Sequence, residues 1–422
     1  MYDTADQNLI RRNVEKLIRE TTSDTPVTVI QGARQVGKST ITSIVTNQID
    51  SRMLSLDNPN TLLAAKANPL DFVNQYRTGM LVIDEVQLCP ELMRVIKLSV
   101  DEDRRPGRFL LTGSADLLHI TGANESLAGR AETVKLYPFS QGELRSKTED
   151  FITKLLTGDI GEILAGVKGM TRDEYISLVS IGGYPDAIKR DARRRKAYFR
   201  NYLTSVLDHD AAKLSGLAHI NKLTEVLKVL SARTSGELVH AHVATLTQIP
   251  ETSIHAYIRL LKDLSLIHEL PAWGRNLTKR AVGRKKISII DTGLAGYLNG
   301  YQEETLADLT QGEAFGALLE TFVVSELFKQ QTWSDTDYTL YHYRDREKRE
   351  VDIVVELPNG KIIALEVKAK SSLVNRDLLG IKKIKEVMGD RFVCGIVLHS
   401  GHEAHAFEKG IYSAPLNALW AL

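Results

Sequence analysis

Four short apolar runs in the first third of the chain predict β-strands. They span residues 27–31, 81–85, 108–112 and 132–136, and small or charged residues mark the ends of the first three. The interval between the first two is long enough for a helix, a strand and a second helix. Because strands that alternate with helices form parallel sheets, the pattern predicts an α/β domain with a parallel sheet over residues 1–145.

The middle of the chain has helical periodicity, followed by two short strands. The three helices and two strands are expected at 223–232, 238–246, 253–266, 267–270 and 286–290, with Thr252 or Ser253 as the cap of the third helix. This order is typical of a winged helix-turn-helix, which we expect over 216–300, after a helical linker over 146–215.

Alternating apolar residues return in the last part of the chain, after one amphipathic helix at 316–329. Strands are expected at 338–344, 350–356 and 361–368, with a hairpin turn at Pro358-Asn359-Gly360 before the third. These elements predict a second α/β domain over residues 301–422.

Composition limits the setting of the protein. The chain has 422 residues, with 54 basic against 53 acidic side chains, so any surface for nucleic acid must be local. Only Cys89 and Cys394 are present, too few for a disulfide framework or a thiolate zinc site. With no secretory signal and no long apolar run, we expect a cytoplasmic protein that does not enter membranes.

A phosphate-binding loop follows the first predicted strand. The segment GARQVGKST fits G-x-x-x-x-G-K-[ST], a pattern in which glycines let the backbone wrap an anion and the lysine contacts the β and γ phosphates. The hydroxyl after the lysine, that of Ser39, would bind Mg²⁺. The residues expected to bind ATP are Gly32, Ala33, Arg34, Gln35, Val36, Gly37, Lys38, Ser39 and Thr40.

The second predicted strand, LVIDE, ends in two carboxylates. A Walker B segment has this form: Asp84 would hold Mg²⁺ and Glu85 would polarise the attacking water. The alternative is a solvated acidic turn. The position of the pair 46 residues after Lys38 favours the Walker interpretation.

Two further residues extend the predicted ATPase site. Ser114 follows the third strand, in a position similar to the sensor 1 of AAA+ proteins, although Gly113-Ser114 is also a good turn. Arg130 precedes the fourth apolar run and resembles an AAA+ arginine finger, which would act on a neighbouring subunit and imply a homo-oligomer. A structural ion pair is the alternative for Arg130.

The C-terminal carboxylates have a spacing similar to the PD-(D/E)xK nuclease signature. Asp352 is followed by Glu366 and by Lys368 two residues later, with Glu320 upstream on the predicted helix. Asp352 and Glu366 would bind Mg²⁺ or Mn²⁺, and Lys368, on the same face of its strand, would position water. Alternatively, the fold is retained without cleavage, and Glu366 and Lys368 form a cross-strand pair on a solvent-facing edge.

Basic residues in the middle of the chain are candidates for DNA contact. On the third predicted helix these are His255, Arg259 and Lys262, and the basic stretch 275–286 lies near the predicted wing. The run DARRRKAYFR from Asp191 suits either phosphate contact or a solvated helix face. Winged helices also serve only to pack domains together, so both interpretations stay open.

The order of these segments resembles one group of proteins, the prokaryotic AAA+ ATPases with a family-specific C-terminal region, which often ends in a restriction-endonuclease-like module. The similarity spans nearly the whole chain and rests on GARQVGKST, LVIDEVQ, LLTGSADLL, SLAGR, LYPFSQGEL, GGYPDAIK, IIDTGLAGYL and the block from Gly316 to Lys368. It implies an AAA+ domain, a central winged helix and a C-terminal nuclease-like module.

These features lead to one main hypothesis and two alternatives. The main hypothesis is an ATP-hydrolysing AAA+ ATPase that acts on DNA or is regulated by it, with possible metal-dependent nuclease activity. The first alternative is a regulatory ATPase whose C-terminal half binds a protein partner and cuts nothing. A nucleotide switch with negligible hydrolysis is the second, and the presence of Glu85 disfavours it.

Overall fold

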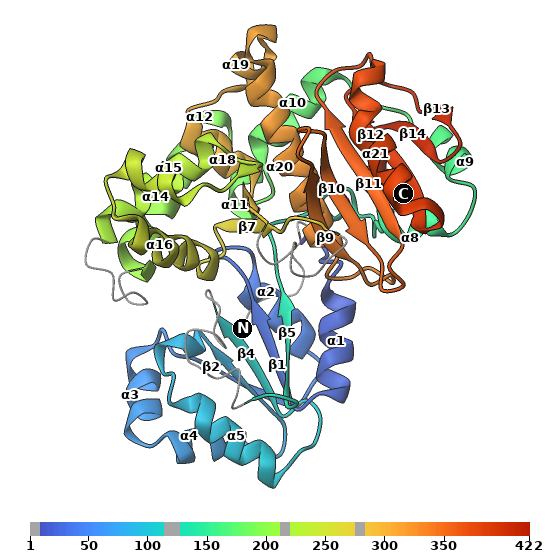
Figure 1. Ribbon diagram of the computed structural model, residues 1–422. Coiled ribbons are helices and arrows are strands. Elements are labelled where there is room, and N and C mark those ends of the chain that lie inside the picture. The colour runs from blue at the N-terminus through green and yellow to red at the C-terminus, as the bar shows by residue number, and fades with distance from the viewer. Residues whose placement is uncertain (1–8, 114–126, 212–219, 275–282) are drawn as a thin grey trace.

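The computed structural model describes residues 9–113, 127–211, 220–274 and 283–422. The N-terminal domain lies below the rest of the molecule in Figure 1, with the central helices at the upper left and the C-terminal sheet at the upper right. Cys89 and Cys394 are both buried and free. Within the described ranges, no helix is both long and apolar enough to span a membrane.

The N-terminal domain is built on a five-stranded parallel sheet in the order β2-β3-β4-β1-β5. Its strands are β1 (Val27–Gln31), β2 (Ser51–Ser55), β3 (Met80–Asp84), β4 (Phe109–Gly113) and β5 (Ala131–Lys135). The four strands predicted from apolar runs are confirmed, each to within one residue. The interval after β1 also holds the expected extra strand, β2.

Helices cover both faces of this sheet. Alternate strand residues point to opposite faces, so that Ile30 packs in one hydrophobic cluster and Val29 in another. The first face is covered by α1 (Glu15–Asp24) and α2 (Lys38–Thr46). The second is covered by α3 (Pro59–Ala67), α4 (Pro69–Asn74) and α5 (Leu92–Glu102).

The central region is mainly helical. Its first part contains α8 (Phe151–Leu156), α9 (Ile160–Ala165), α10 (Arg172–Ile181), α11 (Pro185–Ile188) and α12 (Ala192–Leu203). Next come α14 (Leu223–Ala232), β6 (Gly236–Glu237), α15 (His240–Thr247), α16 (Glu251–Asp263), β7 (Ile267–Leu270) and β8 (Lys286–Ile289). The three strands form a small antiparallel sheet, β6-β8-β7.

The predicted helices and strands of this part are present, with one correction. The prediction that Thr252 or Ser253 caps the third helix is wrong, because α16 begins at Glu251, after Pro250, and no side chain caps it. Proline fits this position because it has no N–H that would need a partner.

The segment Gly182-Gly183 meets Asp291 at the start of α18 (Thr292–Asn299), although they are far apart in sequence. The carboxylate of Asp291 caps this helix by accepting from the Leu294 amide at 3.0 Å, and it also accepts from the Gly183 amide at 2.6 Å. A Cβ on Gly182 would lie 2.3 Å from Asp291 Oδ1, and φ there is +72°. Burial raises the pKa of Asp291, and these backbone donors oppose that rise.

The C-terminal part has a six-stranded mixed sheet in the order β13-β14-β12-β11-β10-β9. Its elements are α20 (Gly312–Gln330), β9 (Thr339–Arg344), β10 (Glu350–Glu356), β11 (Ile362–Lys368), α21 (Leu379–Met388), β12 (Phe392–His399), β13 (His405–Glu408), β14 (Ile411–Pro415) and α22 (Ala418–Ala421), preceded by α19 (Glu303–Ala307). The overall class is α/β, as predicted. The domain boundaries remain predictions.

Candidate functional site

The predicted phosphate loop connects β1 to α2 and is tightly packed at its start. A Cβ on Gly32 would lie 2.1 Å from the backbone oxygen of Leu136, so no larger residue fits there. At the end of the loop, Gly37 has φ +98°, in the left-handed region that favours glycine. The loop therefore delivers the chain directly into the N-terminus of α2, where free amides favour an anion.

Lys38 is the first residue of α2 and its side chain folds back over the loop. The residue is 6% exposed, and Nζ donates to the backbone oxygens of Gly32 and Ala33, each at 3.0 Å. The positively charged ammonium of Lys38 therefore lies against the backbone of the loop. Ser39 and Thr40 follow in the first turn of α2 and are exposed.

The two carboxylates predicted to form a Walker B segment lie where β3 ends. Asp84 is buried and accepts hydrogen bonds from the hydroxyls of Thr112 and Ser55, the latter at 3.5 Å. Glu85 has φ +56° and accepts from the Gln87 side-chain amide. Burial raises the pKa of Glu85, while the nearby ammonium of Lys38 lowers it. A carboxylate in this environment is suited to accept a proton.

Sequence reasoning missed Thr112 and Arg12, which hold this site in place. Thr112 lies on β4, next to β3, so its hydroxyl reaches Asp84. Arg12 donates to the Val36 oxygen of the loop at 2.8 Å and to the Tyr137 oxygen at 2.6 Å, and it pairs with the fully buried carboxylate of Glu143 at 3.0 Å. The register of neighbouring strands could have indicated Thr112, but no local signal marks Arg12.

The two further ATPase candidates have different outcomes. Ser114 lies outside the described residues. Arg130 pairs with Asp101 of the same chain, with Nε 2.6 Å from Oδ1, so the structural ion pair proposed as its alternative is present. Hydrogen bonding to Arg130 lowers the pKa of Asp101. Whether Arg130 acts on a second subunit remains a prediction.

The four C-terminal candidates come together from α20, β10 and β11. Glu320, Asp352, Glu366 and Lys368 line one cavity of about 350 Å³. Lys368 Nζ lies 2.6 Å from Glu366 Oε1, and Asp352 Oδ2 accepts from the Val367 amide at 2.9 Å. Glu366 is buried on β11, an interior strand of the sheet. The alternative of a cross-strand pair on a solvent-facing edge is therefore wrong, because both residues are on one interior strand.

A lysine from the central region reaches into this cluster. Lys286, the first residue of β8, places Nζ 2.7 Å from Glu320 Oε1, 2.5 Å from Glu350 Oε1 and 3.6 Å from Asp352 Oδ1. Although burial opposes its charge, the three carboxylates hold the pKa of Lys286 above its ordinary value. Burial and Asp352 raise the pKa of Glu320 to about 8.

Carboxylate oxygens are suitable ligands for Mg²⁺ or Mn²⁺, but this set is already committed to other partners. Among the residues that the structure describes, no group of three or more acidic, histidine or cysteine side chains is arranged to hold a metal ion. The ammonium of Lys286 fills the position between them. As they stand, the C-terminal residues do not fit a metal.

The predicted DNA-contact residues of the third helix are exposed on one face of α16. His255 stacks on His240 with ring centroids 3.9 Å apart, and Lys262 pairs with Glu269 at 2.8 Å. The basic stretch near the wing is only partly described, since residues 275–282 lie outside the described ranges. The prediction that the whole stretch is a candidate for DNA contact is wrong for its last residue, because the side chain of Lys286 is 4% exposed and paired with acidic residues.

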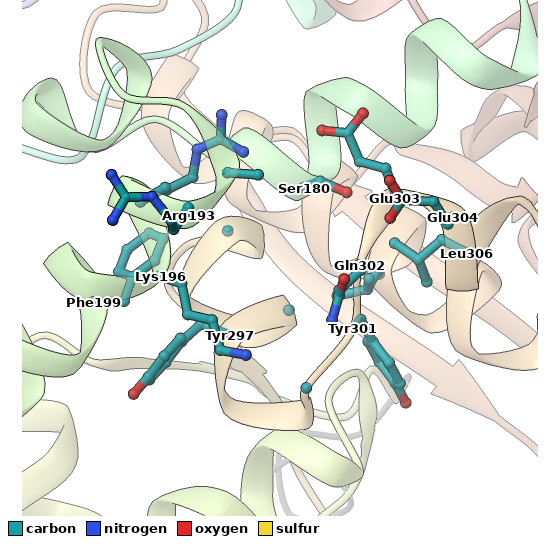
Figure 2. A pocket seen from close by; sticks show the side chains of 16 residues that line it. Ser180, Arg193, Lys196, Phe199, Tyr297, Tyr301, Gln302, Glu303, Glu304 and Leu306 are labelled. Carbon is teal, nitrogen blue, oxygen red and sulfur yellow. The ribbon is translucent and has the colours of Figure 1, made fainter.

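The basic run after Asp191 forms α12 and borders a cavity of about 500 Å³. Figure 2 shows Arg193 and Lys196 on one side of this cavity, with Glu303 and Glu304 on another. A surface of mixed sign attracts a phosphate backbone less than a uniformly basic surface does. The cavity therefore favours the solvated-helix interpretation of the run.

Three family models match successive segments of the chain. Residues 24–145 match the family described as AAA domain. Residues 24–145 form a P-loop ATPase domain of the AAA type. Beyond the AAA domain, residues 172–305 and 315–419 match two families described as domains of unknown function, DUF8612 and DUF4143.

Two mycobacterial proteins are similar to most of the chain. The chain is 29% identical over 366 residues to the uncharacterized protein Rv2008c of Mycobacterium tuberculosis, covering 86% of this chain and 74% of that protein, and equally to Mb2031c of Mycobacterium bovis. Among solved structures it is similar to the Walker-type ATPase PABY2304 of Pyrococcus abyssi, with 15% identity, coverage of 71% and 98%, and a TM-score of 0.46. It is also similar to AMPPCP-bound DnaA from Aquifex aeolicus, with 16% identity, coverage of 62% of this chain and 93% of that chain, and a TM-score of 0.24.

Proposed function

We propose that the AAA domain hydrolyses ATP with Lys38 and Glu85 as its catalytic residues. The observation that carries this proposal is geometric: the Lys38 ammonium lies 3.0 Å from the Gly32 and Ala33 oxygens of the loop, and Glu85 directly follows the buried Asp84 at the end of β3. The pKa of Glu85, which burial raises and the charge of Lys38 lowers, supports it. Lys38 would leave the carbonyls of its own loop to neutralise charge on the β and γ phosphates. Glu85, oriented by Gln87, would accept a proton from the attacking water.

Ser39 and Asp84 fit Mg²⁺, because a hydroxyl and a carboxylate supply hard oxygen ligands. When bound with ATP, the ion would supply Lewis-acid stabilisation of the phosphate oxygens. Thr112 and Ser55 hold Asp84 by hydrogen bonds and thereby orient its carboxylate. The sensor role of Ser114 is proposed from the sequence alone.

An arginine finger at Arg130 would require assembly into a homo-oligomer. Arg130 would have to leave Asp101, and surface ion pairs of this kind are weak. Turnover per subunit would then rise with protein concentration in the parent and would stay low at every concentration in Arg130→Ala. Concentration-independent turnover in both proteins would assign Arg130 to the ion pair alone.

DNA is proposed as the effector, bound through a winged helix at residues 216–300. The element order α14-β6-α15-α16-β7-β8 supports this, because a winged helix has the same order. His255, Arg259 and Lys262 would face the DNA from α16. An arginine or lysine that contacts a phosphate strengthens binding to all sequences alike.

A chain of contacts connects the phosphate loop to α20 of the C-terminal part. Arg12 ties Val36 of the loop to Tyr137 and Glu143, at the exit from the AAA domain. In the same segment, the Gln141 amide donates to Glu326 at 2.8 Å. Since α20 also carries Glu320, nucleotide-dependent movement of the loop has a physical route to the C-terminal cavity.

One observation favours the alternative function, a regulatory ATPase that recognises a protein partner and cuts nothing. Lys286 pairs with Asp352 and with Glu320, and Lys368 pairs with Glu366, so the carboxylates that a metal-dependent nuclease would need already have cationic partners. A module in this state would act in binding or assembly. Cleavage activity of this module would require the lysine to be displaced first.

Both functions can be tested in one assay with purified full-length protein, magnesium and ATP. Phosphate release and DNA cleavage would be followed with linear, branched and single-stranded DNA, using Lys38→Ala and Asp352→Ala as variants. We expect phosphate release that is lost in Lys38→Ala and rises with at least one DNA. If no DNA changes phosphate release and none is cut, the DNA-linked function is wrong and the regulatory function is supported.

A further inference from the structure

The C-terminal cavity contains a fixed positive charge at its centre. Lys286 Nζ is within 4 Å of carboxylates on α20 and β10, those of Glu320, Glu350 and Asp352. Its side chain is 4% exposed. A lysine so deeply buried is retained only if its partners compensate for the loss of hydration, as three carboxylates do here.

Other carboxylate oxygens of the cavity, on Asp352 and Glu366, are also engaged. Asp352 Oδ2 accepts from the Val367 amide, Glu366 Oε1 pairs with Lys368, and Glu366 Oε2 accepts from the Asp352 amide at 3.4 Å. A divalent ion bound by Asp352 and Glu366 would have to displace these partners. It would also lie within a few ångströms of the Lys286 ammonium, and like charges repel strongly at such distances inside a protein.

The lysine comes from a different part of the chain than the carboxylates. It is on β8, within the segment that matches DUF8612, whereas the carboxylates are within the segment that matches DUF4143. β8 is the middle strand of its sheet, paired through Gly236 on one side and Leu270 on the other. The charge is therefore held in place by the fold of the central region.

We propose that Lys286 is the resident cation of the C-terminal cavity and excludes divalent metal ions while β8 is packed against α20 and β10. The site opens to metal only when this contact is broken. The inference concerns metal binding and does not depend on ATP hydrolysis or on DNA cleavage. Its test can therefore fail while the proposed ATPase function stands, and the reverse also holds.

The experiment measures Mn²⁺ binding to the full-length protein without nucleotide, from the loss of the free Mn²⁺ signal in electron paramagnetic resonance. The variants are Lys286→Met, which keeps the length of the side chain, and the matched control Lys285→Met, which removes a lysine paired with Glu269 outside the cavity. We expect Lys286→Met to bind one Mn²⁺ at least about tenfold more tightly than the parent, because a buried like charge is removed. The control should bind as the parent does.

Asp352→Asn in the Lys286→Met background should abolish the gain, which assigns the ion to the cavity. Equal Mn²⁺ affinity in the parent and in Lys286→Met would overturn the proposal. So would a gain in Lys286→Met that survives Asp352→Asn.

Lys286→Met leaves three acidic groups without their partner, so a second variant keeps the test valid if this protein does not fold. Lys286→Gln removes the positive charge but keeps a side-chain amide that can donate to Glu320 or Glu350. We expect Mn²⁺ affinity to rise here as well, by about two- to fivefold, because the like charge is gone while the amide still competes with the ion for these carboxylates. If the folded Lys286→Gln protein binds Mn²⁺ no better than the parent, the exclusion by Lys286 is refuted.

Discussion

The phosphate loop and the C-terminal cavity both combine a lysine with carboxylates, but they hold their lysines differently. Lys38 donates to two backbone carbonyls, which are neutral partners that a phosphate can replace. Lys286 pairs with three carboxylates, which no neutral ligand can replace. In the first site a phosphate can replace two neutral partners of the lysine, whereas in the second the lysine is held by three carboxylates.

The difference shows that chemistry-bearing residues in the expected places do not by themselves make a ready site. In the AAA domain the lysine and the carboxylates are local to one sheet edge and one loop. In the C-terminal cavity, a residue from outside the predicted motif changes the charge at its centre. Four variants separate the two arrangements. Two are measured by ATP turnover and two by stability, and each pair begins with the larger effect.

Lys38→Ala should lower ATP hydrolysis by roughly 100- to 1,000-fold, since one positioned charge on the transferred phosphate contributes this much. Phosphate release under saturating ATP measures it. Lys66→Ala, which changes an exposed lysine on α3, is the control and should retain the parent rate. Retained hydrolysis in Lys38→Ala would show that Lys38 does not act on the phosphates, and its proposed functional difference from Lys286 would be wrong.

Glu85→Gln should lower hydrolysis by about 100-fold, the contribution of one general base, and leave ATP binding intact. Because the pKa of Glu85 is raised and its ionised form is the base, the parent rate should fall with decreasing pH at a higher pH than for an ordinary glutamate. The pH profile of the rate, with nucleotide affinity by fluorescence, checks both points. A profile without an acid limb in the parent would contradict the role of Glu85.

Lys286→Met should lower the free energy of unfolding by about 3–5 kcal/mol, the usual cost of leaving buried charges without a partner. Denaturant unfolding followed by tryptophan fluorescence is the measurement. Replacing Glu320 as well, in the double variant Lys286→Met with Glu320→Leu, should recover part of the lost free energy of unfolding. An unchanged stability in the single variant would show that the cavity carboxylates are not held by this lysine.

Arg12→Ala should lower the free energy of unfolding by about 1–3 kcal/mol, because the buried carboxylate of Glu143 loses a charged donor. It should also weaken any effect of DNA on ATP turnover, since Arg12 joins the loop to the exit segment. Arg11→Ala, at the preceding residue, is the control for both readouts. Normal DNA stimulation in a folded Arg12→Ala protein would exclude this route of coupling.

Local sequence signals are sufficient for the AAA domain. Its strands alternate with helices, and the phosphate loop is a contiguous motif, so the positions of Lys38 and Glu85 follow from the sequence alone. Strands β7 and β8 of the central region and the spacing of Asp352, Glu366 and Lys368 are predictable for the same reason, because period-two alternation is local. The third strand of that sheet, β6, is only two residues long and has no such signal. Thr112 requires knowledge of the strand order, which decides whether its hydroxyl meets Asp84.

By itself, the sequence determined the α/β class, the phosphate loop and the identity of most charged groups in both sites. Only the tertiary structure decided which charges compensate one another. Lys286 and Glu320 are 34 residues apart, and Arg12 and Glu143 are 131 residues apart. No periodicity connects residues at such separations, and their pairing follows from the packing of β8 against α20 and of the N-terminal segment against the exit from the AAA domain.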